Sequence, residues 1–367
     1  MSLSIGIVGL PNVGKSTLFN ALVKNAQAEA SNYPFCTIDP NVGVVEVPDS
    51  RLAKLTEISK SKKTVPTTIE FIDIAGLVKG AHKGEGLGNK FLSHVKETDA
   101  IAMVVRFFKN SDIVHVAGKI EPAEDIKTIQ LELILSDLNV IEKTFERMRK
   151  ELKAGDNETK KKIAILEKIK EGLENELPVW AIFPNSEDLA PIKEIQLLTS
   201  KPVLYIANVS EDMAGASSEE LIEKYNLQEI IKNPESLIPI SAKVESELGA
   251  LNKDEQGEFL ESLGLKESGL ARLIHAAYST LGLITYLTSG EQETRAWTIK
   301  KGSTAPQAAG VIHTDFERGF IAAEVIKYED FIQYNGWAGC KEKGLIKTEG
   351  KTYIVQDGDI VLFRFNV

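Results

Sequence analysis

The chain has only two cysteines, Cys36 and Cys340, among its 367 residues. Two thiols cannot build a disulfide framework or supply the four ligands of a structural zinc site, which excludes both kinds of scaffold. No apolar run approaches the roughly eighteen residues that a membrane-spanning helix needs. The first residues run into Ile5 to Val8 without a charged leader or a cleavage site. We therefore expect a cytoplasmic protein with no membrane partner.

An excess of positive charge is also missing, because the formal net charge is −10 at pH 7. Such a surface does not attract nucleic acid as a whole, so we expect no DNA partner. Any contact with RNA has to come from a local basic patch. The remaining composition, 43% hydrophobic and 26% charged, is that of a globular protein with a substantial core, and the length predicts two or three domains.

The most informative stretch is GLPNVGKST, from Gly9 to Thr17, which follows an apolar run and precedes a segment compatible with a helix. We expect a strand, a glycine turn and the start of a helix. In this arrangement backbone N–H groups face a polyphosphate, Lys15 reaches the terminal phosphates, and the Ser16 hydroxyl can ligate Mg²⁺. The predicted contacts of this loop come from Asn12, Val13, Gly14, Lys15, Ser16 and Thr17.

Two later stretches have the spacing of nucleotide-dependent switches. The loop from Asn32 to Pro40 contains Thr37, whose hydroxyl can complete a Mg²⁺ shell when a terminal phosphate is present, although a structural threonine is the alternative. The run from Thr68 ends in Asp73, whose carboxylate can hold a water of the Mg²⁺ shell, and Gly76 can point its N–H at a terminal phosphate. We expect Ser16, Thr37 and Asp73 to form the metal site.

Residues 126–199 have the pattern of a helical insertion. Apolar residues recur at steps of three and four, which predicts two antiparallel helices that pack as a coiled coil. The predicted seam consists of Leu131, Ile134, Leu138, Ile141, Phe145, Met148, Leu152, Ile163, Leu166, Ile169, Leu173 and Leu177. The turn between the helices is basic, with seven basic and three acidic side chains between Arg147 and Lys162. This turn is either an RNA-binding tip or a solvated charged turn.

Two further apolar runs, at 202–207 and 237–240, each open into a polar turn. At the mouth of a doubly wound sheet such strand ends line the ligand crevice, so we expect these turns to hold a base. From residue 283 the pattern changes to short strands and turns. The predicted division is therefore a nucleotide-binding domain at 1–125 and 200–282, a helical insertion at 126–199, and a small α+β domain at 283–367. The base-reading candidates are Asn208, Val209, Glu211, Ser241, Ala242 and Lys243.

Taken together, these motifs resemble the YchF or Obg-like ATPases over essentially the whole chain. The resemblance rests on GLPNVGKST, NYPFCTIDP, DIAGLVKGAHKGEGLGNKF, NVSE and SAK, together with the helical insertion and the C-terminal segment. It implies a doubly wound P-loop sheet, a helical hairpin and a β-grasp-like TGS domain. It also implies Mg²⁺-dependent ATP hydrolysis, association with ribosomes and a role in stress control, the last by analogy alone.

The base-reading turn supports ATP by its own chemistry. An aspartate at the fourth position of NKxD would accept hydrogen bonds from guanine, but this chain has Glu211 there and Val209 in place of the lysine. Guanine loses its distinctive partner, while Asn208 and the backbone near Val209 can contact adenine. Leaving a buried polar group unpaired costs about 1–3 kcal/mol, which is enough for a tenfold preference. The alternative is that glutamate merely replaces aspartate and GTP is still used.

Leu77 stands where a regulatory GTPase would usually place a glutamine that orients the attacking water. The chemically able substitutes are His82 and His115, since imidazole can orient or deprotonate water near neutral pH. The family resemblance favours His115, beside Lys15 as the other catalytic residue. The same resemblance gives Asn12 a role in holding an activating K⁺.

Three classes of function therefore compete. An ATPase switch associated with the ribosome or ribosomal RNA is the main interpretation. A GTP-driven ribosome-associated factor and a nucleotide-gated binding module with negligible turnover are the alternatives, and Leu77 keeps the second of these open. Cys36 precedes Thr37 directly, so its oxidation would disturb the first switch, unless the thiol is buried and inert.

Overall fold

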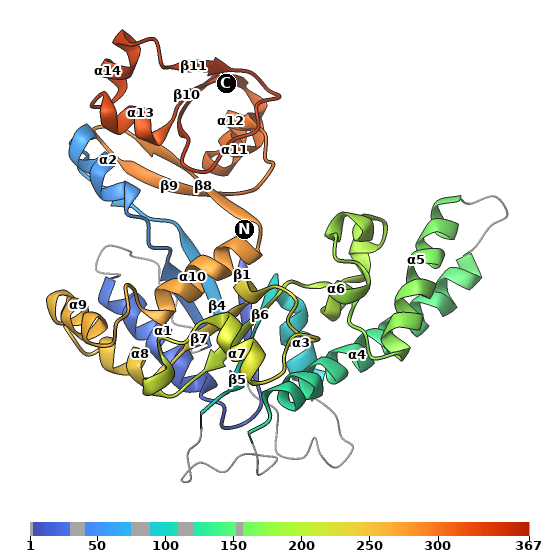
Figure 1. Ribbon diagram of the computed structural model, residues 1–367. Coiled ribbons are helices and arrows are strands. Elements are labelled where there is room, and N and C mark those ends of the chain that lie inside the picture. The colour runs from blue at the N-terminus through green and yellow to red at the C-terminus, as the bar shows by residue number, and fades with distance from the viewer. Residues whose placement is uncertain (1–2, 30–40, 75–88, 109–119, 152–156, 367) are drawn as a thin grey trace. The chain divides into compact units, whose positions relative to one another are not determined.

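The computed structural model describes residues 3–29, 41–74, 89–108, 120–151 and 157–366 (Figure 1). Contacts divide the chain into two compact units. The first unit contains residues 1–44 and 70–276, and the second contains 45–69 and 277–367. The chain thus leaves the first unit early, contributes a segment to the second, and returns before completing the first.

The first unit is built on a six-stranded sheet with the order β2-β4-β1-β5-β6-β7. Parallel pairing joins β1 to both β4 and β5, β5 to β6, and β6 to β7. Every residue of β1 and of β5 is buried, which requires that both faces of the sheet be covered. The predicted α/β, doubly wound sheet is confirmed. Its strands are β1 (Ser4–Gly9), β2 (Val42–Glu46), β4 (Thr68–Asp73), β5 (Ala100–Arg106), β6 (Val203–Asn208) and β7 (Leu237–Ile240).

The order of the strands fixes where a ligand can bind. Strand β4 lies on one side of β1 and β5 lies on the other, so the direction of winding reverses at β1. In doubly wound sheets the ligand crevice lies beyond the carboxyl end of the strand at such a switch point. The glycine turn that follows Gly9 stands at this position.

Helices connect or follow these strands, and several begin at side-chain caps that the sequence provides. Ser217 and Glu220 form a reciprocal capping box at the start of α7, as do Asn252 and Glu255 at α9. These caps satisfy N–H groups that have no partner inside the helix. The helices are α1 (Lys15–Glu29), α3 (Asn89–Glu97), α7 (Ser218–Lys224), α8 (Ala242–Leu248), α9 (Lys253–Ser262) and α10 (Gly269–Thr280), with short turns at η4 (Glu211–Met213) and η5 (Pro234–Ser236).

The helical insertion contains the two predicted helices, α4 (Pro122–Glu151) and α5 (Asn157–Glu174), which pack against each other. Their seam is also covered by α6 (Val179–Ile182), η2 (Ser186–Ile195) and η3 (Leu198–Ser200), and this cover adds Val179, Ile192 and Leu197 to one apolar core. The helix pair is therefore part of a small helical core. Leu131 and Leu177, which the seam pattern places inside, are 41% and 50% exposed because the core ends before them.

A buried carboxylate holds this core together. Asp137 of α4 accepts hydrogen bonds from the backbone N–H groups of Leu198 and Thr199 and from the Thr199 hydroxyl, at 2.7–2.8 Å. Burial raises the pKa of Asp137 to about 6, although the three hydrogen bonds favour the charged form. Nearby, the Lys201 ammonium donates to the carbonyl oxygens of Val95 and Lys96, at the end of α3.

The second unit is an α+β fold whose mixed sheet has the order β11-β10-β12-β8-β9-β3. Helix α11 packs on one face with Tyr286 and Phe363, and α2 and α13 pack on the other with Leu287 and Ile360. The strands are β3 (Thr64–Val65), β8 (Leu283–Ser289), β9 (Thr294–Lys300), β10 (Phe320–Ile326), β11 (Lys347–Glu349) and β12 (Ile360–Phe365). The helices are α2 (Arg51–Ser59), α11 (Ala305–Ile312), α12 (Thr314–Arg318), α13 (Tyr328–Gln333) and α14 (Trp337–Glu342).

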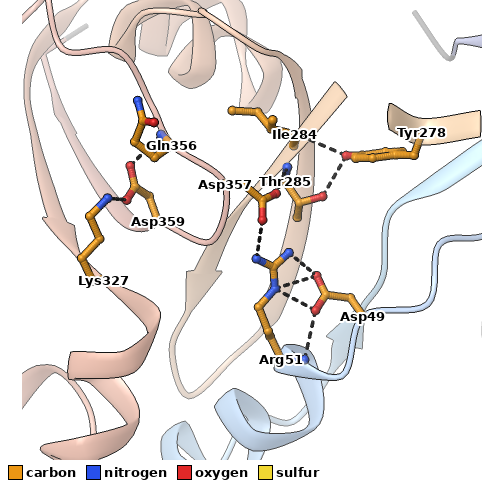
Figure 2. A network of polar contacts seen from close by, with 9 residues as sticks. All are labelled: Asp49, Arg51, Tyr278, Ile284, Thr285, Lys327, Gln356, Asp357 and Asp359. Atoms are coloured by element: carbon orange, nitrogen blue, oxygen red, sulfur yellow. Dashed lines mark hydrogen bonds and ion pairs between the residues drawn. The ribbon is translucent and has the colours of Figure 1, made fainter. Parts of the chain in front are cut away.

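An arginine ties the early segment into this unit (Figure 2). Arg51, the first residue of α2, binds Asp49 beside it and Asp357 from the C-terminal region, the latter at 2.7 Å. Asp357 in turn accepts from the backbone N–H of Thr285 at 2.8 Å. A neighbouring carboxylate, Asp359, is fully buried and binds Lys327 at 2.6 Å. The sequence contains no sign that residues 45–69 belong here, and the domain boundaries expected from it stay a prediction.

Candidate functional site

The glycine turn has the backbone conformation that a phosphate loop needs. Strand β1 ends at Gly9 and α1 begins at Lys15, with Asn12 and Gly14 between them at φ 65° and 92°. A Cβ atom at Gly14 would lie 2.1 Å from Nδ2 of Asn208, so this position accepts only glycine. The turn lines a cavity of about 340 Å³ formed by Leu10, Pro11, Asn12, Gly14, Lys15, Ser16 and Thr17.

The ammonium of Lys15 forms an ion pair with Asp73. Lys15 begins α1 and Asp73 ends β4, so the sheet brings the predicted phosphate ligand and the predicted carboxylate of the metal site together. The backbone N–H of Asp73 also donates to the carbonyl oxygen of Asn41 at 2.8 Å. Both side chains are largely buried, with 9% and 16% of their surface exposed. The Lys15 ammonium can bind a polyanion such as a triphosphate, and the Asp73 carboxylate beside it can interact with the cation that accompanies the polyanion.

The residues around the Lys15–Asp73 pair fit a magnesium ion. A P-loop protein holds Mg²⁺ with a hydroxyl, phosphate oxygens and waters rather than with a cage of side chains. Ser16, in the first turn of α1, and Asp73 supply a hydroxyl and a carboxylate at one edge of the sheet. The described part of the chain contains no cluster of three or more His, Cys, Asp or Glu residues that could hold a metal alone.

Asn208, the last residue of β6, joins three predicted parts of the site. Its amide nitrogen donates to the carbonyl oxygen of Val13 at 2.8 Å, and its amide oxygen accepts from the N–H of Ala242 at 3.1 Å. Only 5% of Asn208 is exposed. The side chain therefore locks the phosphate loop to the turn after β7, where Ser241 caps α8 through its hydroxyl.

A second, larger cavity of about 800 Å³ extends from the phosphate loop to these turns. A purine nucleoside fits within such a volume. Nine of the predicted site residues line it, and Phe108, Ser210, Asp212, Ser246 and Glu247 line it without having been predicted. The nine are Asn12, Gly14, Thr17, Asn208, Val209, Glu211, Ser241, Ala242 and Lys243. No motif marks Phe108, which lies two residues after the end of β5.

The carboxylate of Glu211 is already engaged by a lysine. Lys243 Nζ lies 3.0 Å from Glu211 Oε2 and 3.8 Å from Glu247 Oε1. The hydrogen bond from Lys243 to Glu211 raises the pKa of the lysine. Val209 is 2% exposed, and its N–H donates to the carbonyl oxygen of Ile240 at 2.9 Å. The turn that reads guanine in an NKxD protein thus carries a paired glutamate and a buried valine.

Several predicted residues lie outside the described part of the chain: Cys36, Thr37, Gly76, Leu77, His82 and His115. The other cysteine, Cys340, is buried, and its sulfur lies 3.4 Å from the carbonyl oxygen of Asp330. Among the described helices, none combines the length and the apolar character that crossing a bilayer requires.

Comparison with known proteins matches the chain along its whole length. Residues 4–168 match a family described as 50S ribosome-binding GTPase, and residues 283–366 match the C-terminal region of YchF GTPases, described as a protein of unknown function. Proteins called ribosome-binding ATPase YchF are 56% identical in Bacillus subtilis and 53% identical in Escherichia coli O157:H7, over 100% of both chains.

Solved structures agree with these matches. The structure of the Schizosaccharomyces pombe YchF GTPase has a TM-score of 0.88 and 41% identity, with 99% of this chain and 98% of that chain covered. A GTP binding protein from Pyrococcus horikoshii, at a TM-score of 0.59 and 19% identity, covers 99% of this chain and 100% of its own and shares the fold alone. Because it is more than half identical, over its full length, to proteins named ribosome-binding ATPase YchF, this chain belongs to the YchF family.

Proposed function

We propose that the protein is a cytoplasmic, Mg²⁺-dependent ATPase that associates with the ribosome. The observation that carries this proposal is a pair of adjoining cavities that share Asn12, Gly14 and Thr17. The first includes Lys15, the partner of Asp73, and can take a triphosphate, and the second reaches the turns at Asn208 and Ser241 and can take a base. The names of the relatives, which call them ribosome-binding ATPases, support the same assignment.

At the phosphate end each residue has a definite role. Lys15 and the backbone N–H groups of residues 12–17 neutralise charge on the transferring phosphoryl group. Ser16 and Thr37 would hold the Mg²⁺, and Asp73 would orient waters of its shell; the bound ion supplies charge neutralisation across the terminal phosphates. Gly76 would donate its N–H to the same phosphates. Because Lys15 already pairs with Asp73, binding of a triphosphate exchanges one anionic partner for another.

At the base end the geometry supports adenine. Glu211 is bound by Lys243, so its carboxylate is less available to guanine than a free aspartate would be. The buried Val209 leaves an apolar wall and no cationic side chain at the second position of the turn. Asn208 remains within reach of the base while it holds the loops together, and Ser241, Ala242 and Lys243 border the cavity.

The attacking water is the remaining requirement, because Leu77 cannot orient it. We assign this role to His115, with His82 as the alternative, and we give Asn12 the task of helping to hold an activating K⁺. Imidazole typically contributes on the order of 100-fold or more to such a step.

Hydrolysis assays test this assignment. His115→Ala should leave ATP affinity within about twofold and lower turnover at least tenfold, the behaviour of a contact made only in the transition state. Lys15→Ala should weaken binding as well, since its ammonium faces phosphate in the ground state. Normal turnover in His115→Ala with loss of turnover in His82→Ala would assign the role to His82. Turnover that is equal in K⁺ and Na⁺ would contradict the role of potassium.

Measurements of nucleotide affinity and turnover also test two alternative functions. A GTP-driven ribosome-associated factor is supported by the name of the fission-yeast relative, which is called a GTPase. Such a factor would bind GTP at least as tightly as ATP. A nucleotide-gated binding module would bind ATP, show negligible turnover even on ribosomes, and change its partner affinity with nucleotide alone.

A further inference from the structure

We infer that Arg106 is a positioning residue for the base: it fixes Phe108 on the wall of the 800 Å³ cavity. The inference rests on the proposed nucleotide site, since it assigns the base to that cavity. It concerns a residue that no motif of the phosphate loop, the switches or the base-reading turns contains.

Arg106 has the placement of a structural anchor. It is the last residue of β5, pairs in register with Asn208 of β6, and is 1% exposed. A guanidinium this deeply buried is uncommon and needs compensating partners. Burial lowers the pKa of Arg106, and the negative charge of Asp125 opposes this lowering. Asp125 lies in the first turn of α4 and is itself only 5% exposed.

The arginine contacts Phe108 in two ways. Its Nε donates a hydrogen bond to the carbonyl oxygen of Phe108 at 3.1 Å, and its guanidinium carbon lies 4.5 Å from the centroid of the Phe108 ring. The first contact fixes the backbone two residues beyond the arginine, and the second fixes the plane of the ring. One side chain therefore controls both where Phe108 lies and how its ring is oriented.

Phe107, between Arg106 and Phe108, fixes the backbone of this segment. Phe107 is 3% exposed, packs edge-on against Tyr225 with ring centroids 4.8 Å apart, and its N–H donates to the carbonyl oxygen of Asn208 at 2.8 Å. Phe107 thus points into the core, whereas Phe108 lines the cavity. Among the described residues that line it, Phe108 has the only aromatic ring.

A fixed aromatic ring suits the flat face of a nucleobase. Stacking on a ring that is already ordered avoids the entropy cost of immobilising it during binding. Arg106 should therefore strengthen binding of the nucleoside part and leave the phosphate contacts unchanged. In steady-state hydrolysis its loss should raise KM and leave kcat within about twofold, because the contact is the same in ground and transition state.

The test compares Arg106→Lys, Phe108→Leu and the double variant by calorimetry with Mg²⁺, using ATP, GTP and inorganic tripolyphosphate. Lysine keeps the charge but loses the planar fork that binds the carbonyl and stacks on the ring. We expect each single variant to bind the preferred nucleotide roughly fivefold or more weakly, with tripolyphosphate unchanged. The double variant should be no weaker than the weaker single variant, because both changes remove the same contact.

Arg272→Lys is the matched control, because Arg272 also donates to a carbonyl oxygen, that of Pro239 at 2.8 Å, but does not line the cavity. It should bind all three ligands as the wild type does. Full nucleotide affinity in Arg106→Lys, losses that multiply in the double variant, or equal weakening of nucleotide and tripolyphosphate would each overturn the inference. Wild-type preference for GTP would overturn only the proposed ATP specificity, because the comparison with tripolyphosphate can then be made with GTP. Failure of the wild type to bind either nucleotide would overturn both.

Discussion

Glu211 is one methylene group longer than the aspartate of an NKxD turn, and under the proposed function this difference changes which base the turn accepts. The longer side chain reaches a lysine on the neighbouring turn, and the two form an ion pair beside the cavity that both residues line. Both side chains are exposed, at 44% and 69%, so the pair contributes little to stability and its effect lies in where it holds the carboxylate. Base choice should therefore respond to the length of this side chain more than to its charge.

Shortening this side chain tests the idea directly. Glu211→Asp should bind GTP about threefold or more tightly than the wild type, because the shorter carboxylate leaves Lys243 and faces the guanine edge. We leave Val209 unchanged, since a lysine there would replace a side chain that is 2% exposed. Calorimetry with GTP and ATP measures the change, and Glu247→Asp, the other acidic neighbour of Lys243, serves as the control. Unchanged GTP affinity would place specificity in other contacts.

Among the secondary-structure elements, α4 and η3 are joined by the buried carboxylate of Asp137. Burial raises its pKa to about 6, above that of an unfolded aspartate, so the folded protein binds this proton more readily. Linkage then requires that the contribution of Asp137 to stability be largest below the unfolded pKa and fall as pH rises through about 6.

The difference in unfolding free energy between wild type and Asp137→Asn isolates this group, because all other titrations cancel. Between pH 4 and pH 7 we expect the wild type to lose about 2–3 kcal/mol relative to the variant, for a shift of this size. Urea unfolding at several pH values measures it. A wild type that gains stability over the variant as pH rises would mean that the three hydrogen bonds outweigh burial and depress the pKa. Asp188→Asn, at an exposed position of η2, serves as the control.

At the same scale the sequence predicts local elements better than distant partners. The glycine turn, the strands that carry Asp73 and Asn208, and the helices of the insertion all follow from patterns within a few residues. In contrast, β3 pairs with β9 across about 230 positions of sequence, and Arg51 binds Asp357 across 306 positions. No local pattern encodes such pairing. The same holds for the cover of residues 178–198 over the seam.

Within the site, the residues that the sequence could place together are those whose motif carries its own chemistry. Asn208, Glu211 and Lys243 could be placed together because parallel strands end at one edge of the sheet. Phe108 and Arg106 were missed because an aromatic residue and an arginine at the end of a buried strand are also typical of ordinary packing. Their role depends on the register of β5 with β6, which only the structure provides.

For the whole molecule, a net charge of −10 means that any binding to ribosomal RNA has to rest on a local basic patch. Lys160 and Lys161 of α5 are both exposed, whereas Lys162 pairs with Glu194 at 2.8 Å and with Glu158 at 3.6 Å. Lys162 thus serves the helical core, and the two preceding lysines are the better candidates for contact with phosphate.

Replacing Lys160 and Lys161 with glutamate should weaken cosedimentation with ribosomes about tenfold at low salt, and the salt dependence of binding should become less steep. The control replaces Lys300 and Lys301, two adjacent exposed lysines of the second unit, with glutamate. If the first variant pellets with ribosomes as the wild type does at every salt concentration, the basic turn is only a solvated charged turn. Equal loss in both variants would indicate a general charge effect.

The measurement that tests the central claim most directly is the affinity of the wild-type protein for ATP and for GTP, by calorimetry with Mg²⁺. A site that offers guanine a lysine-bound glutamate and a buried valine should bind ATP at least about tenfold more tightly than GTP. Equal affinities, or tighter binding of GTP, would contradict the assignment of ATP as the preferred nucleotide of this protein.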